Sequence, residues 1–174
     1  MSGARFPLVR HLATPCEAVS AIEVEATRPA PGRLALTYRV TGDAARLVVP
    51  PPTAPARTDE LWRTTCFEAF VRPDGGEAYC EFNLAPSGAW AAYRFGGYRA
   101  GMAPLETVAP AVAFVVTDTG CELAAALELP AAGPVRLGLS AVIEERGGRK
   151  SYWALAHAGE RPDFHSFAGV PLPI

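Results

Sequence analysis

The stretch CFEAFVRPDGGEAYCEFN, residues 66–83, has the pattern of a β-hairpin. Two short apolar runs flank PDGG, in which a proline enters the turn and the glycines tolerate positive φ. A four-residue loop over 73–76 pairs Arg72 with Glu77 and puts Glu68 directly opposite Glu81. Like charges that face each other across two strands destabilise a sheet. We therefore expect a compensating group here: an Arg, a bound cation or one shared proton.

Period-two alternation recurs along the rest of the chain, between 17 prolines and 16 glycines that cut it into short pieces. Residues 33–40, RLALTYRV, place four apolar side chains on one face, and 121–130, CELAAALELP, alternate in the same way and favour a strand over a helix. The other strand candidates are 21–28, 45–50, 111–116, 135–144 and 150–157. Many short strands with regular turns predict an all-β fold, an antiparallel, jelly-roll-like β-sandwich. We expect one domain over 1–174 with its core at about 18–172, and a proline-rich loop over 50–60.

Composition excludes several classes of protein. The formal net charge is −2 and the basic residues are scattered, so the phosphate backbone of a nucleic acid is not an expected partner. No apolar run reaches the roughly 20 residues of a membrane helix, and the N-terminus lacks the apolar core of a signal peptide. A bacterial-type cytoplasmic location follows as an expectation. The four cysteines form no CxxC pair, so we expect reduced, mostly buried thiols.

The hairpin continues into a third strand after a second turn at 86–87. A two-residue loop pairs Asn83 with Trp90 and brings Arg94 to the face that carries Glu68 and Glu81. A three-residue loop would instead flip the third strand, which makes Arg94 the least secure of this set. Such a face suits a polar ligand, because carboxylates accept hydrogen bonds from hydroxyls and an indole can stack on a sugar ring. The alternative is a solvated outer face on which water screens the two acids.

Several motifs together resemble the DOMON-like domains, relatives of the family-nine carbohydrate-binding modules and of haem- or sugar-binding DOMON domains. The motifs are DELW (59–62), YCEFNLAPSGAW (79–90), SYWALAH (151–157) and RPDFHSF (161–167), and the resemblance covers roughly 18–172. It implies a β-sandwich with a ligand site on the concave face, usually without catalysis.

The same resemblance implies roles for individual residues. Trp62 matches the aromatic residue that stacks on the sugar, Glu68 the acid that binds its hydroxyls, Asn83 the polar residue beside them, and Trp153 a late Trp that closes around the ligand. Where those modules tend to carry Arg, this sequence has Glu81, which makes a cationic, amino-sugar or metal-assisted ligand conceivable. The predicted ligand-binding set is Trp62, Glu68, Glu81, Asn83, Arg94 and Trp153, for a small polar ligand that is plausibly a saccharide.

Other functions stay open from the sequence. A b-type haem would need Met102 together with His157 or His165 as axial ligands, and Ca²⁺ is conceivable beside the acids. Glu68 and Glu81 could also act as the acid pair of a glycosidase. An interaction domain that uses the same sheet face is the plainest alternative.

Overall fold

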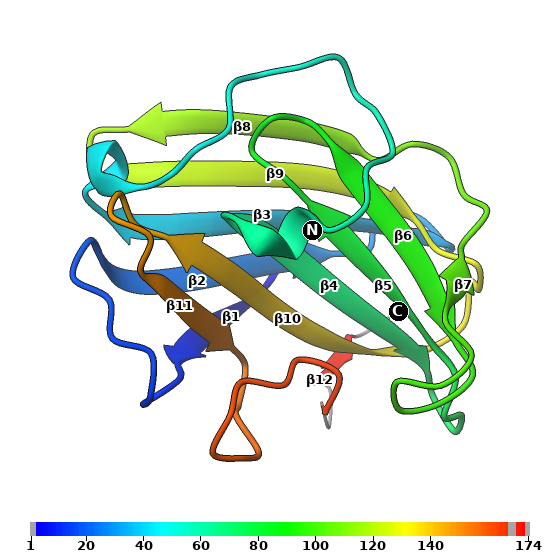
Figure 1. Ribbon diagram of the computed structural model, residues 1–174. Helices are drawn as coiled ribbons and strands as arrows, with labels where there is room; N and C mark the ends of the chain where they lie inside the picture. Colours follow the sequence, from blue (N-terminus) through cyan, green and yellow to red (C-terminus); the bar gives the residue numbers. More distant parts are fainter. Residues whose placement is uncertain (1–2, 167–169, 173–174) are drawn as a thin grey trace.

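A computed structural model describes residues 3–166 and 170–172 of the protein. Within these residues the chain forms twelve strands and two single turns of 3-10 helix, η1 and η2 (Figure 1). The strands are β1 Ala4–Arg10, β2 Val19–Thr27, β3 Arg33–Gly42, β4 Cys66–Pro73, β5 Tyr79–Leu84, β6 Trp90–Phe95, β7 Ala103–Pro104, β8 Ala111–Thr117, β9 Gly120–Glu128, β10 Val135–Glu144, β11 Lys150–Ala154 and β12 Val170–Leu172. The turns are η1 Ala44–Arg46 and η2 Leu61–Arg63. No helix in the described part of the chain is long and apolar enough to cross a membrane.

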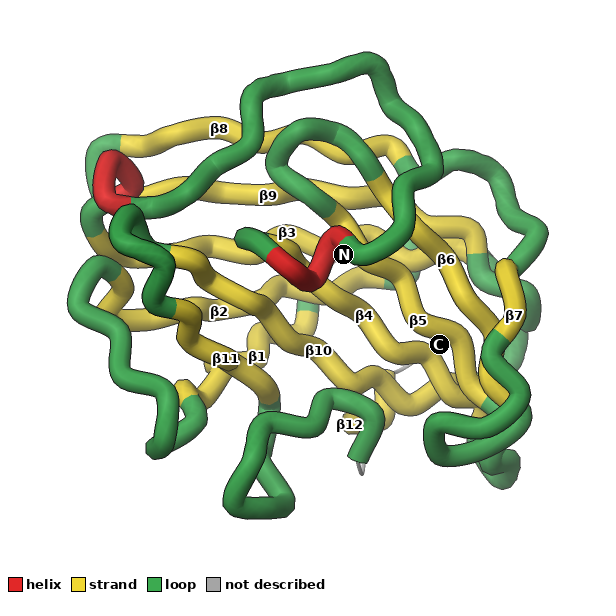
Figure 2. Tube along the Cα trace, viewed as in Figure 1, coloured by secondary structure: helices red, strands yellow, loops and turns green. Residues whose placement is uncertain are grey.

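The strands form two antiparallel layers, which confirms the predicted β-sandwich (Figures 1 and 2). The back sheet runs β8-β9-β3-β2-β1, and the front sheet runs β7-β6-β5-β4-β10-β11. Strand β1 joins the layers, because its first residues pair with β2 and its last two, Val9 and Arg10, pair with β11. The segment 121–130 lies in β9, so alternation outweighed its alanine and leucine content, as expected.

The apolar core lies between the two layers and follows from the period-two pattern. The side chains of Leu34, Leu36 and Tyr38 on β3 meet Phe67 on β4 and Phe82 on β5, and all five are at most 1% exposed. Burial of the Tyr38 phenol is offset by a hydrogen bond, since its hydroxyl donates to the backbone oxygen of Glu68 at 2.7 Å. This bond ties the two sheets together at Glu68, one of the two acids of the first hairpin.

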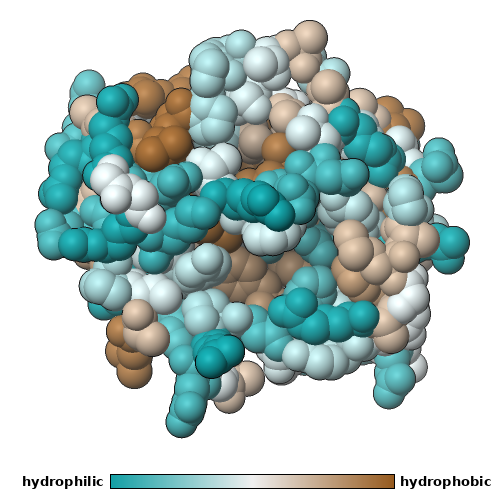
Figure 3. Space-filling model, in the orientation of Figure 1, coloured by the Kyte–Doolittle hydropathy of each residue, from teal (hydrophilic) through white to brown (hydrophobic). Residues whose placement is uncertain are grey.

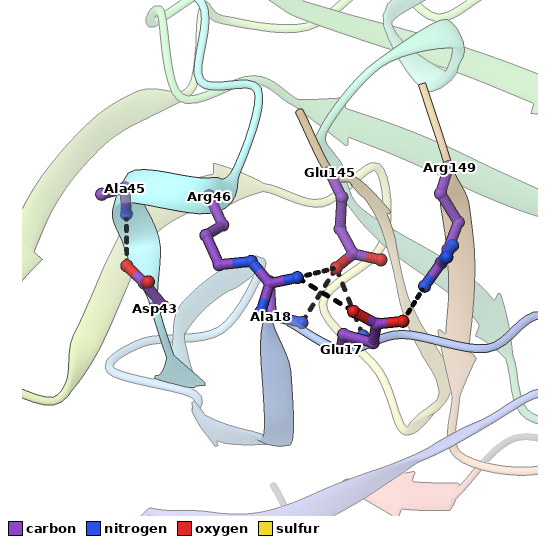
Figure 4. Close-up of polar contacts among 7 residues, drawn as sticks. All are labelled: Glu17, Ala18, Asp43, Ala45, Arg46, Glu145 and Arg149. Atoms are coloured by element: carbon purple, nitrogen blue, oxygen red, sulfur yellow. Dashed lines mark hydrogen bonds and ion pairs between the residues drawn. The ribbon is translucent and has the colours of Figure 1, made fainter. Parts of the chain in front are cut away.

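The predicted strand over 45–50 is wrong. Residues Ala44–Arg46 form η1 instead, because the Asp43 carboxylate caps the turn by accepting from the backbone N–H of Ala45 at 3.0 Å. Arg46 donates to Glu17 at 3.1 Å and lies 3.9 Å from Oε1 of Glu145 (Figure 4). These local polar contacts override the β propensity of the segment.

The predicted register of the first hairpin is also wrong, by two residues. Glu68 pairs with Asn83, and Phe70 pairs with Glu81. The turn is longer than four residues, because the N–H of Asp74 donates to Pro134 beside β10 and holds the end of β4 on that side. A shift of two residues keeps every side chain on its predicted face. The two glutamates are therefore diagonal neighbours on one face rather than an opposed pair.

The register of the third strand, β6, differs from the prediction by one residue. Ala85 donates to the carbonyl of Ala89 across a three-residue loop, in which Gly88 adopts a φ of 91°. This one-residue shift flips β6, so Arg94 pairs with Cys80 and lies exposed on the face away from the glutamates, while Trp90 enters the core. The side chains of Tyr93 and Phe95 take the face on which Arg94 was predicted.

Candidate functional site

The outer face of the front sheet carries a recess of about 490 Å³. Two segments border it: η2 lies over β4 and β5, and residues 160–166, after β11, approach from the opposite side (Figure 1). In the same orientation, Figure 3 shows a hollow with brown, apolar surface inside a teal rim. The recess is lined by Trp62, Glu68, Glu81, Tyr93, Phe95, Arg99, Met102, Val142, Tyr152, Pro162, Phe164 and His165.

A row of polar side chains crosses the sheet at the floor of this recess. Glu68 on β4 lies directly between Asn83 on β5 and Ser140 on β10, and all three are at most 3% exposed. Glu81, two residues before Asn83 on the same strand, is 6% exposed, and its Oε1 accepts a hydrogen bond from Nδ2 of Asn83 at 2.9 Å. The Oδ1 atom of Asn83 is buried and has no hydrogen-bond partner in the protein.

Both floor carboxyl groups resist ionisation. Burial, followed by the charge of nearby Glu81, raises the pKa of Glu68 well above its usual value, while the Ser140 hydroxyl acts weakly in the other direction. Burial likewise raises the pKa of Glu81, and the Asn83 hydrogen bond and the Arg99 charge partly oppose this. Arg94 is therefore not the compensating group, because it lies on the other face; burial and the charge of Glu81 instead favour the protonated form of Glu68.

Aromatic rings and one imidazole form the walls. Tyr79 and Phe95 stack with ring centroids 4.8 Å apart, and His165 packs edge-on to Phe95 at 5.0 Å. The Tyr79 hydroxyl accepts from the backbone N–H of Arg99 and shares a hydrogen bond of 2.7 Å with Nδ1 of His165. Burial, and then the charge of Arg99, lowers the pKa of His165 to about 4, so the ring is neutral at neutral pH. We assign its proton to Nε2, which faces Oε2 of Glu81 at 3.7 Å, too far for a hydrogen bond.

The segment that carries His165 is tied to the loop after β6. Asp163 accepts hydrogen bonds from the Tyr98 hydroxyl, from the Arg99 guanidinium at 2.8 Å and from the backbone N–H of His165 at 3.2 Å. These bonds lower the pKa of Asp163 against the effect of its partial burial. The positive charge of Arg99 is thus matched by Asp163 before any ligand arrives.

Trp62 is presented by the loop that precedes β4. The Tyr93 hydroxyl donates to Asp59, and both Arg57 amino groups donate to backbone carbonyls, those of Ala92 and Leu105. These bonds fix the DELW segment against the edge of the front sheet. The indole of Trp62 stays 48% exposed at the mouth of the recess, although one of its faces lies near the Arg63 guanidinium.

The structure brings together four of the six predicted ligand-binding residues. Trp62, Glu68 and Glu81 line the recess, and Asn83 supports Glu81 from the floor. Arg94 does not join them, because the three-residue loop flips β6. Trp153 does not either: β11 directs Tyr152 into the recess, so Trp153 points into the core, where its Nε1 donates to Ser151 at 2.9 Å.

Most of the walls were not predicted. Because Arg94 was predicted on the glutamate face, its neighbours Tyr93 and Phe95 were left out of the site, and the correct loop length would have recovered both by period two. Tyr152 follows from the position of Trp153 in the same way. The motif RPDFHSF belongs to the predicted resemblance, but the position of 162–165 beside the recess was not predicted, because it depends on where a non-repetitive segment folds back.

The two histidines named as possible haem ligands contact other groups. Nε2 of His157 donates to the backbone oxygen of Val9 at 2.8 Å, and Nδ1 of His165 shares a hydrogen bond with the Tyr79 hydroxyl. Met102 and His165 both line the recess, and Met102 is 58% exposed. Among the described residues, no group of three or more His, Cys, Asp and Glu side chains is arranged to hold a metal ion.

Two solved structures share this architecture. A candidate carbohydrate-binding protein from Bacteroides uniformis matches with a TM-score of 0.64 at 15% identity, over 94% of this chain and 82% of that one. A family-nine carbohydrate-binding module from Caldicellulosiruptor kristjanssonii, solved with cellotriose, matches with a TM-score of 0.53 at 8% identity, over 89% and 73%. The chain shares their fold. No protein-family model and no curated protein matches its sequence.

Proposed function

We propose that the protein is a non-catalytic module that binds a saccharide in the recess on the outer face of its front sheet. The observation that carries this proposal is the buried row of Glu68, Asn83 and Glu81 at the base of an aromatic-walled hollow. The fold shared with a module that was solved with cellotriose supports it. We also propose, on the sequence motifs described above, that the protein is related to the DOMON-like domains.

The recess has the chemistry that sugar recognition needs. A carboxylate accepts hydrogen bonds and a protonated carboxyl group also donates one, so Glu68 and Glu81 together can serve hydroxyl groups in either sense. The exposed indole of Trp62 offers an apolar surface for the C–H face of a pyranose ring. A volume of about 490 Å³ lies within the range of small-molecule sites. A short saccharide fits this combination of size, polarity and aromatic surface.

Calorimetry with a saccharide panel that includes glucose and cellotriose, with and without Ca²⁺, tests the proposal. We expect binding by the wild type and a loss of about tenfold in affinity for Trp62→Ala, because a stacking surface is removed. Val116→Ala is the matched control, since Val116 is 67% exposed on β8 of the back sheet. Binding of no saccharide in the panel would refute the proposal.

A further inference from the structure

We infer that the saccharide bound here carries a protonated amine, and that its ammonium group sits between Glu68 and Glu81. This inference rests on the proposed function and narrows it to a class of ligand, the amino sugars. It follows from an excess of acidic groups and of hydrogen-bond acceptors at the floor of the recess.

The positive charges near the recess are already matched by other groups. Arg99 pairs with Asp163 at 2.8 Å, and Arg63 on η2 pairs with Glu60 at 2.7 Å. On the neighbouring strands, Lys150 faces Glu144 across the β10–β11 pair. His165 is neutral, and Asp59 accepts a hydrogen bond from Tyr93. The two floor glutamates are thus the acidic groups lining the recess that have no Arg or Lys partner among the described residues.

The hydrogen-bonding groups at the floor show the same imbalance. Oε1 of Glu81 accepts from Asn83, which leaves Oε2 of Glu81, the Glu68 carboxyl and the orphan Oδ1 of Asn83 as acceptors, against one unpartnered hydroxyl donor, that of Ser140. Asn83 is 0% exposed, so an unmet acceptor there is costly in the protein alone. An ammonium group brings three donors and no acceptor, whereas a hydroxyl brings one donor and an acceptor. The aromatic walls also favour a cation, because ring faces attract positive charge.

Binding of an ammonium group changes the protonation of the floor. A cation beside the two acids favours their ionised forms, which burial disfavours in the protein alone. The complex therefore releases protons when it forms, whereas a neutral sugar leaves them in place. A measured release of protons on binding therefore shows that the acids recognise the charge of the ammonium group, and not only that the recess has room for an amine.

The test uses three trisaccharides with one β-1,4-linked backbone that differ at carbon 2: the glucosamine trimer, its N-acetylated form and cellotriose. Calorimetry in two buffers of different ionisation enthalpy gives the affinity and the number of protons released. We expect the glucosamine trimer to bind about tenfold to a hundredfold more tightly than cellotriose, the range of a charge-assisted hydrogen bond. We expect net proton release with the glucosamine trimer alone.

The variant Glu81→Gln keeps an acceptor for Asn83 and removes the charge, so it should abolish the preference and the proton release while cellotriose still binds. Glu77→Gln, in the exposed hairpin turn, is the matched control and should behave as the wild type. Equal binding of the three trimers, or a preference for cellotriose, would overturn this inference and leave the saccharide-binding proposal standing. Binding of no trimer would overturn both.

Discussion

Glu68→Gln should make the protein more stable at alkaline pH and leave it unchanged at acid pH. Glu68 is 3% exposed, and its carboxyl group must either stay protonated or carry an unmatched charge inside the sheet face. Because its pKa is raised in the folded state, folding favours the protonated acid. The wild type therefore has its full stability below the unfolded value, near 4.5, and loses this contribution as the pH rises through the raised pKa.

The size of the effect follows from the raised pKa. Each unit by which the folded pKa exceeds the unfolded one costs about 1.4 kcal/mol of stability once the pH is above both values. Glutamine does not titrate and carries no such cost. We expect the variant to gain on the order of 1–3 kcal/mol in the free energy of unfolding at about pH 8.

Urea denaturation at about pH 4 and pH 8 measures the difference directly, provided that the slope with denaturant is the same in both proteins. Glu77→Gln is the control for removal of a negative charge at an exposed position and should show little change at either pH. A Glu68→Gln variant that is less stable than the wild type at pH 8, or that gains equally at both pH values, would refute the reasoning about the buried acid.

Three further outcomes follow from the same contacts. Tyr38→Phe removes the hydrogen bond between the sheets and should lower the free energy of unfolding by about 1–2 kcal/mol in denaturant titrations; an unchanged value would show that water replaces the bond. Asp163→Asn breaks the pair with Arg99 and should weaken saccharide binding about threefold in calorimetry. The stability change should stay below about 1 kcal/mol, as expected for a partly exposed ion pair. Unaltered affinity would show that the Arg99–Asp163 pair does not contribute to binding. Arg94→Ala should leave affinity unchanged, because the side chain lies on the other face, and a clear loss would contradict the observed orientation of β6.

Period two explains why the floor of the site was predictable although the register was not. The hairpin pairing was wrong by two residues, yet a shift of two returns Glu68, Glu81 and Asn83 to the same face. The same rule made the third strand fail, since one additional loop residue at Gly88 reversed every side chain from Trp90 to Phe95. The face of a side chain is thus predicted correctly when the register is wrong by an even number of residues, and incorrectly when it is wrong by an odd number.

The walls of the recess and the position of residues 160–166 could not be predicted from this periodicity. Trp153 and Tyr152 are neighbours on one strand, and only the pairing of β11 with β10 decides which of them enters the recess. The position of His165 depends on the bond to Tyr79, 86 residues away in sequence. Long-range contacts of this kind leave no periodic trace, so the sequence predicted the fold and the acidic floor but not the shape of the site.

The central claim is that two buried carboxyl groups with raised pKa values meet the ligand. Carbon-13 NMR titration of the glutamate carboxyl resonances, assigned with Glu68→Gln and Glu81→Gln, tests this directly. We predict that the Glu68 resonance titrates well above the ordinary glutamate pKa of about 4.3, that the Glu81 resonance titrates above it, and that both shift when a bound saccharide is added, while that of Glu77 does neither. Two resonances that titrate at the ordinary value and do not respond to a saccharide that binds would contradict the account.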